Sequence, residues 1–294
     1  MSMRISDLGA TTAALRRLTL HMASLERART DLGTGKRIRR PSDDIGGASR
    51  VMSLRSTVTA NQQAQRNVDD ALMWVNLTDT VLQDVVSRLH RAKELAVAGA
   101  NATTAADGIA AEVAALRDDF VELANTTHLG RGLFAGHRAG DAVANVAGTW
   151  TYLGDAGDVT RRISETETVT VNVTADDVFG FTSGRDLFTA LDDLEARLLA
   201  GDTAAVSSSI DDIDAALDDA LESLSRLGGA GERLDAARSR LSGDLLTIQE
   251  NLSSLEDVDL AQAVVQLEMQ QAAYEAALAA LRSLDLSTLA SFMR

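Results

Sequence analysis

Apolar residues recur at alternating steps of three and four positions over both ends of the chain. The amino-terminal row contains Ile5, Leu8, Leu15, Met22 and Leu25. Such steps place side chains on one face of an α-helix. Gly33 and Gly35 predict the end of this helix, because glycine is the commonest residue just past a helix.

The same spacing predicts a second helix of roughly 48 residues from Arg50, about 70 Å long at about 1.5 Å per residue. Ser42, Asp43 and Asp44 precede it and are typical of a helix start, where side-chain oxygens accept hydrogen bonds from free backbone amides. A third helix is predicted from Ile109 to Leu123.

The pattern changes at His128, where glycines become frequent and the helical spacing stops. Three strand-like pieces follow, at Trp150–Leu153, at Val159–Ile163 and over the alternating Val169, Val171 and Val173. We therefore expect a β-rich insert of roughly 50 residues in the middle of the chain.

Helical spacing resumes from Leu187 to Leu198, and a long helix is predicted after Asp202. Asp259 and Gln262 resemble a capping box and predict the start of a last helix. Its apolar row contains Leu260, Val264, Leu267, Tyr274, Leu278 and Leu281.

The fold class predicted from these patterns is mainly α: a long antiparallel helical rod or coiled coil formed by both chain ends, with a small β-rich insert in the middle. Three regions are expected. They are a terminal helical assembly core (1–45 with 256–294), a helical rod domain (46–130 with 200–255) and a β-rich outer insert (131–199).

The first and last helices carry too few apolar residues to form a domain alone. We therefore expect them to pair with each other and with copies of themselves, and to be loose in a dilute monomer, because helices owe most of their stability to packing. The predicted assembly seam consists of Ile5, Leu8, Leu15, Met22, Leu25, Leu260, Val264, Leu267, Tyr274, Leu278 and Leu281.

The amino-acid composition argues against several classes of function. The chain of 294 residues has one proline, no cysteine and a formal net charge of -15. One proline permits long helices, and the absence of cysteine excludes disulfides and thiolate chemistry. The net charge disfavours nucleic acid as a partner. No apolar leader and no run of about 18 apolar residues occurs, so we expect neither a cleaved secretion signal nor membrane insertion.

The sequence predicts no catalytic, cofactor-binding or metal-binding residues. Gly130–Gly136 superficially resembles a phosphate loop but lacks the Gly-Lys-Ser/Thr ending. Asp43 and Asp44 are better explained by helix-start chemistry than as catalytic carboxylates. The four histidines lack zinc-ligand spacing. The basic run Lys36–Arg40 is interpreted as a solvated or inter-subunit loop. We therefore expect no enzyme activity and no cofactor.

Two segments carry a family resemblance. Near the amino terminus, Met3–Ser6 is followed by Leu32–Ile38, which includes Gly35, Lys36, Arg37 and Ile38, and then by Pro41, Ser42, Asp43 and Asp44. Near the carboxy terminus, Asp257–Ala261 is followed by Leu267 and by Ala272–Leu278. In this order the segments closely resemble the two terminal regions of the flagellin superfamily of bacterial flagellar proteins.

Three features resemble the members of this superfamily that join the flagellar hook to the filament. They are the proline in the loop Arg39–Asp44, the Gly130–Gly136 segment and the Tyr152–Asp155 turn. Two alternatives remain open: a flagellin-type filament subunit, and a cytoplasmic coiled-coil adaptor or chaperone.

The resemblance implies a structural subunit that serves motility. It implies export in an unfolded state through the flagellar type III apparatus, which needs no cleaved signal, and an extracellular place in the flagellum. The implied partners are copies of the chain in a ring or helical assembly, the other hook-associated protein, flagellin, and an export chaperone that holds the carboxy-terminal helix.

Overall fold

The computed structural model describes residues 2–101, 106–164, 166–182 and 184–292; of these, the side chains of 2–11, 281 and 283–292 are not described. Helices make up most of this part of the chain, and the predicted mainly α fold with a small β insert is confirmed. The elements are α1 Ser2–Thr34, α2 Ile45–Ala100, α3 Ala106–Ala124, β1 Thr127–His128, β2 Arg131–Gly132, β3 Val143–Val146, β4 Thr149–Tyr152, β5 Thr160–Arg162, β6 Thr168–Thr170, α4 Ala175–Phe179, α5 Leu187–Ala200, α6 Thr203–Glu256 and α7 Leu260–Phe292.

The chain divides into two compact units. The first combines Met1–Thr59 with Leu245–Arg294, and the second is Ala60–Asp244. The three-part division expected from the sequence stays a prediction. Among the described residues, no helix has the length and apolar character that a bilayer crossing requires.

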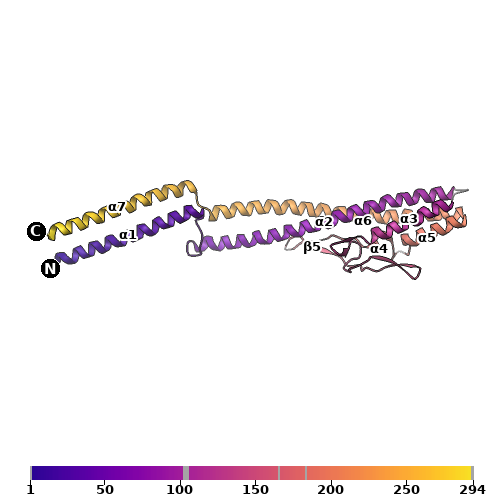
Figure 1. Ribbon diagram of the computed structural model, residues 1–294, viewed down its shortest axis with the longest axis horizontal. Helices are drawn as coiled ribbons and strands as arrows, with labels where there is room; N and C mark the ends of the chain where they lie inside the picture. The colour runs from indigo at the N-terminus through magenta and orange to yellow at the C-terminus, as the bar shows by residue number, and fades with distance from the viewer. Residues whose placement is uncertain (1, 102–105, 165, 183, 293–294) are drawn as a thin grey trace. The chain divides into compact units, whose positions relative to one another are not determined.

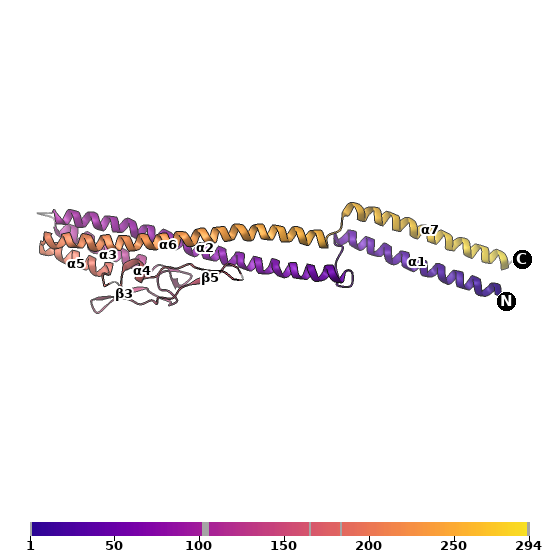
Figure 2. The same cartoon turned by 180° about the vertical axis from the view of Figure 1, so that it is seen from behind.

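In the first unit, α1 and α7 lie side by side and run in opposite directions, with the two chain ends together (Figures 1 and 2). Leu25 and Ala28 of α1 and Ala263 of α7 are buried. Burial of apolar side chains between two helices is the main source of helix stability in a protein.

The helix ends follow the capping chemistry expected from the sequence, but the start of α2 differs from the predicted position. Gly35 has a φ of 69° and donates its amide to the carbonyl of Asp31 at 2.9 Å, which ends α1. The start of α2 is five residues earlier than predicted, at Ile45, because Asp44 accepts the amide of Gly47 at 2.9 Å. The first turn of α2 lacks the apolar row used for the prediction, so the predicted helix was too short.

In the second unit, helices α2, α3, α5 and α6 surround one apolar core together with the β insert. The predicted helices at 109–123 and 187–198 correspond to α3 and α5. The largest fully buried side chains include four phenylalanines, Phe120, Phe134, Phe179 and Phe188. Few aromatic residues are present, but they are concentrated in this core.

The insert contains three antiparallel two-stranded sheets, in which β1 pairs with β2, β3 with β4, and β5 with β6. The predicted pieces at Trp150–Leu153 and Val159–Ile163 correspond to β4 and β5. The alternating Val169, Val171 and Val173 are all buried, although β6 itself ends at Thr170. Four elements of the insert were not predicted from the sequence: β1, β2, β3 and α4.

Candidate assembly interface

The predicted assembly seam lies on both buried and exposed faces of the α1–α7 pair. Leu25 is buried, with 5% of its surface exposed. Four members are exposed: Leu15, Met22, Leu260 and Val264. Three members are partly buried: Leu267, Tyr274 and Leu278. The side chains of Ile5, Leu8 and Leu281 lie outside the described part of the chain. The role of these residues in assembly stays a prediction.

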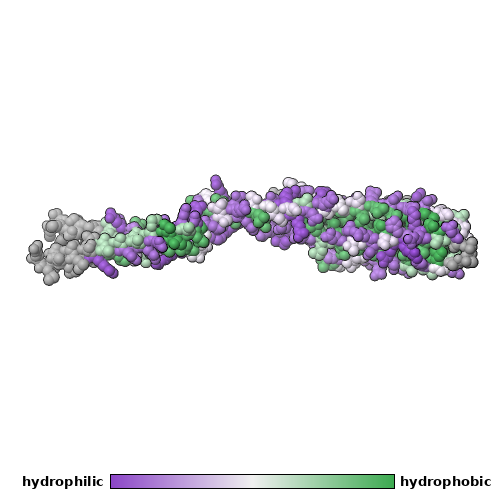
Figure 3. All heavy atoms as spheres, turned by 90° about the horizontal axis from the view of Figure 1, so that it is seen from above, coloured by the Kyte–Doolittle hydropathy of each residue, from purple (hydrophilic) through white to green (hydrophobic). Residues whose placement is uncertain are grey.

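Sequence reasoning missed further exposed apolar side chains on the same helices. Leu20 is 68% exposed, Val265 is 55% exposed and Met269 is 56% exposed. They lie outside the rows of three and four steps, which is why a search for one apolar face omitted them. The space-filling view shows hydrophobic surface on this helix pair (Figure 3). Contiguous exposed apolar surface is typical of a protein interaction site.

The family motif, by which we mean Gly35–Ile38 together with Pro41–Asp44, forms the connection between α1 and α2 and is hydrogen-bonded to the end of α6. The amides of Arg37 and Ile38 donate to the carbonyl of Glu256 at 2.7 and 3.4 Å. Val258 donates its amide to the carbonyl of Gly35 at 2.9 Å. The Ile38 side chain is buried. The motif therefore joins the two helix-to-helix connections of this unit.

A buried carboxylate lies at this crossing. The side chain of Glu256 is 3% exposed, and its Oε1 atom accepts hydrogen bonds from Lys36 Nζ and from the Arg55 guanidinium. A buried carboxylate requires such partners, because an unpaired buried charge is costly. The presence of Lys36 in the motif is thus explained by its ion pair with Glu256, which lies 220 residues away in the sequence.

The rest of the motif shapes the loop before α2. Asp43 accepts the backbone amides of Arg39 and Arg40 at 3.1 and 2.9 Å. The amides of Arg40 and Arg39 hold the pKa of the Asp43 carboxyl below its ordinary value, because they stabilise the charged form. Pro41 and Ser42 are exposed. Asp44, not Ser42, supplies the cap of α2.

In the second unit, the Gly130–Gly136 segment and the Tyr152–Asp155 turn contact each other. The Tyr152 hydroxyl donates to the carbonyl of Asp155 at 2.6 Å, and the Asp155 amide donates to the carbonyl of Ala135 at 3.2 Å. Burial and the nearby carboxylates raise the pKa of Tyr152 to about 12. Gly136 has a φ of 68°, and a Cβ there would overlap the carbonyl of Asp155. Gly136 therefore allows the close packing of this segment against the turn.

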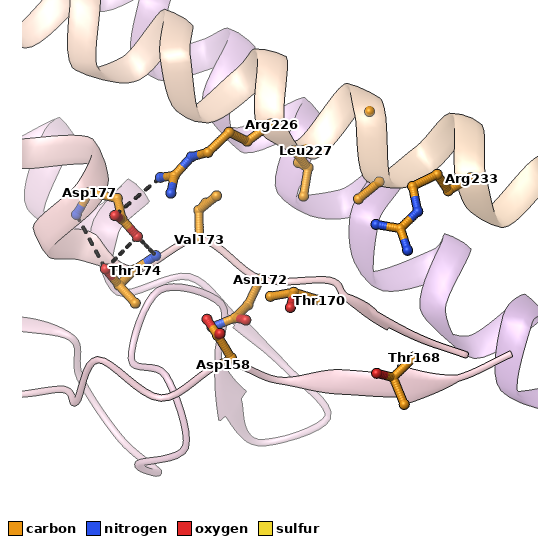
Figure 4. A pocket seen from close by; sticks show the side chains of 12 residues that line it. Asp158, Thr168, Thr170, Asn172, Val173, Thr174, Asp177, Arg226, Leu227 and Arg233 are labelled. Atoms are coloured by element: carbon orange, nitrogen blue, oxygen red, sulfur yellow. Dashed lines mark hydrogen bonds and ion pairs between the residues drawn. The ribbon is translucent and has the colours of Figure 1, made fainter. Parts of the chain in front are cut away.

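A polar cavity of about 500 Å³ separates β6 from α6 (Figure 4). Thr168 and Thr170 line one side, and Arg226 and Arg233 line the other. At one end, Asp177 forms an ion pair with Arg226 at 3.1 Å. Among the described residues, no group of three or more histidine, aspartate or glutamate side chains could hold a metal ion.

Two family models match the chain. The bacterial flagellin N-terminal helical region matches residues 5–139, and the bacterial flagellin C-terminal helical region matches residues 210–289. The chain belongs to the flagellin family. Together the two matches include all of α2 and α3 and most of α1, α6 and α7, so the family regions contain both the connection between α1 and α2 and the exposed apolar helices.

The chain is similar to proteins named flagellar hook-associated protein 3. The one from Escherichia coli strain K12 is 27% identical over 288 residues, which are 89% of this chain and 90% of the relative. The one from Salmonella typhimurium strain LT2 is 28% identical over 271 residues, 83% of this chain and 85% of the relative. Flagellins are also among its relatives.

Among solved structures, the chain is similar to one described as a putative flagellar hook-associated protein from Vibrio parahaemolyticus. The TM-score is 0.68 at 21% identity, and the match covers 73% of this chain and 100% of the other. This similarity supports the fold described above.

Proposed function

We propose that this protein is a structural subunit of the bacterial flagellum at the hook–filament junction and serves flagellum-dependent motility. The family membership and the hook-associated relatives support this function. The observation that carries it is the exposed apolar surface of α1 and α7, where Leu20, Val265 and Met269 are each more than half exposed.

The mechanism is assembly by packing of these helices against neighbouring subunits. Burial of apolar surface contributes roughly 25 cal/mol per Å², so contacts repeated around a ring hold a load without covalent links. Head-to-tail contacts between identical chains generate rings or helical tubes, depending on the rotation between subunits. In this mechanism the terminal helices are the assembly core and the β insert faces outward. The chain needs no catalysis and no cofactor.

The partners that we propose are copies of this chain, the other hook-associated protein and flagellin. An export chaperone holds the α7 segment before secretion, because its apolar side chains are exposed until assembly. Export proceeds through the flagellar type III apparatus, and the mature protein is extracellular. We propose no nucleic-acid partner, because the net charge of -15 repels phosphate, and no insertion into a membrane.

Deletion of the gene, followed by microscopy and analysis of the medium, tests the function. We expect cells that make hooks, lack filaments and shed flagellin into the medium, and complementation should restore filaments. Deleted cells with normal filaments would contradict the proposal. A filament subunit gives another result: purified protein would polymerise alone into long filaments. A cytoplasmic adaptor would remain in the cytosol and be absent from purified flagella.

A further inference from the structure

The connection between α1 and α2 contains a strongly basic cavity. Its volume is about 550 Å³, and four arginines line it together with two aspartates and a serine. The arginine basin, as we name it, consists of Arg27, Arg37, Arg39 and Arg40. It belongs to the first unit, and Arg27 lies on α1 itself.

Four arginines and two aspartates line this cavity, so half of its positive charge has no carboxylate in the lining to balance it. Asp31 forms an ion pair with Arg39 at 2.9 Å. The Asp43 carboxylate is directed at two backbone amides. Arg37 donates to the uncharged carbonyl of Leu255 at 3.0 Å. Within the described part of the chain, neither Arg27 nor Arg40 forms a salt bridge, and both side chains are exposed to solvent.

The unpaired arginines belong to a chain whose charges are unevenly distributed. Residues 1–59 contain eleven lysine and arginine residues against five aspartate and glutamate residues. Residues 60–244 contain fifteen basic residues against 31 acidic ones. The acidic excess of the chain therefore lies in the second unit, and the amino-terminal segment is basic.

The acidic excess is densest on α6. No lysine or arginine occurs between Arg197 and Arg226. Asp211, Asp218 and Glu222 are exposed, and spacings of seven and four residues place them on one face of the helix. Burial and the carboxylates of Glu222 and Asp218 raise the pKa of the neighbouring Asp219.

We propose that the arginine basin of one copy binds the acidic face of α6, Asp211, Asp218 and Glu222, of a second copy. The inference rests on the proposed function, because it assigns a contact to the assembling subunit. Arginine forms paired hydrogen bonds with carboxylates, which give direction as well as attraction. Because the two surfaces differ, the contact is heterologous and each copy can bind one neighbour on each side.

The test measures self-association of the full chain by sedimentation velocity. The basin variant carries Arg27→Glu and Arg40→Glu, and the face variant carries Asp218→Lys and Glu222→Lys. Each variant alone should associate at least about tenfold more weakly than the natural chain in about 0.1 M salt. About 1 M salt should weaken the natural chain likewise, because the screening length falls from about 10 Å to about 3 Å.

An equimolar mixture of the two variants provides the sharpest result. In the mixture, the acidic basin of the basin variant meets the basic face of the face variant, and the natural basin of the face variant meets the natural acidic face of the basin variant. The mixture should therefore regain the association that each variant alone lacks. Matched controls reverse exposed charges elsewhere: Arg50→Glu with Arg66→Glu on α2, and Glu232→Lys with Asp235→Lys on α6. These controls should associate like the natural chain.

A natural chain that stays monomeric in about 0.1 M salt would overturn this inference, as would a mixture that does not regain association. Basin and control variants weakened equally would indicate a general charge effect and also overturn it. If the basin binds free phosphate or another flagellar protein and the basin variant self-associates like the natural chain, the occupant is a different one and the inference is overturned too. The natural chain's absence from purified flagella instead contradicts the proposed function.

Discussion

The guanidinium of Arg55 in α2 donates a hydrogen bond to the buried carboxylate of Glu256 at the end of α6. Lys36 of the family motif contacts the same oxygen atom. One buried carboxylate therefore holds two cations that come from different parts of the sequence. This arrangement fixes the course of the chain between α1 and α2 at its crossing with the connection between α6 and α7.

Glu256→Ala should loosen this crossing without unfolding the second unit. We expect a loss of about 1–2 kcal/mol, less than for a fully buried pair, because Lys36 and Arg55 are about half exposed and regain water. The amides of Arg37 and Ile38 should then exchange their hydrogens about tenfold faster, as measured by NMR or mass spectrometry. Glu250→Ala, at an exposed position on the same helix, should leave both amides unchanged.

Leu20→Asp should block assembly while leaving the free chain folded. Leu20 is 68% exposed, so a polar side chain there changes the free energy of unfolding by about 0.5 kcal/mol or less. Incorporation into flagella should be lost, because the carboxylate must be buried against a neighbour. Thermal unfolding of purified protein and immunoblots of purified flagella measure the two effects.

Two further variants separate assembly from stability. Leu25 is 5% exposed, so Leu25→Asp should destabilise the α1–α7 pair itself, by about 3 kcal/mol or more. Met73→Asp alters an exposed methionine of the second unit, 55% exposed, and should be incorporated normally. If Leu20→Asp subunits enter flagella as well as Met73→Asp subunits do, the exposed face of α1 is not an assembly surface.

Gly136→Ala should destabilise the β insert. The backbone of Gly136 is left-handed, and an alanine Cβ would overlap the carbonyl of Asp155. The strain and the displaced turn together should cost about 2 kcal/mol or more. Gly140→Ala also has a positive φ, 103°, but no atom within 4 Å, so it should cost only the strain, about 1 kcal/mol. Urea unfolding followed by tryptophan fluorescence compares the two, and equal losses would exclude the packing explanation.

Helix positions were predictable from the sequence because each helix repeats its own spacing, as α3 and α5 show. The partner of Lys36 was not, because Glu256 lies 220 residues away and nothing in the local pattern connects them. Likewise, the exposed Leu20 could be placed on a helix, but its exposure depends on which face α7 covers.

Two of the missed elements, β3 and α4, show why the local pattern is insufficient in the insert. The strand β3 has the sequence Val-Ala-Asn-Val, a short segment in which two residues that favour strands flank two that do not. It is fixed by the Asn125 side chain, which accepts the amides of Ala142 and Val143 and donates to the carbonyl of Val143. Helix α4 has five residues, too few to show a period, and depends on a capping box.

Asp177 of α4 and Asp219 of α6 should affect the free energy of unfolding in opposite ways as they titrate. Burial alone would raise the pKa of Asp177, but hydrogen bonds from Thr174 and the charge of Arg226 outweigh it and lower that pKa (Figure 4). Its contribution to stability is therefore present above its ordinary pKa, 3.8, and is lost as the pH falls through the lowered value. Burial, Glu222 and Asp218 raise the pKa of Asp219.

Asp177→Asn should therefore lower the free energy of unfolding at pH 7, by about 1 kcal/mol, since the capping box is lost. Asp219→Asn should raise it at pH 7, because the charged form of Asp219 is disfavoured in the folded chain. The stability that Asp219 contributes is present below its ordinary pKa of 3.8 and disappears as the pH rises through the raised value. Urea unfolding from pH 7 to about pH 3 should show both differences shrinking toward zero in acid. Asp235→Asn, at an exposed position of α6, should show neither effect, and a destabilising Asp219→Asn would contradict the assignment.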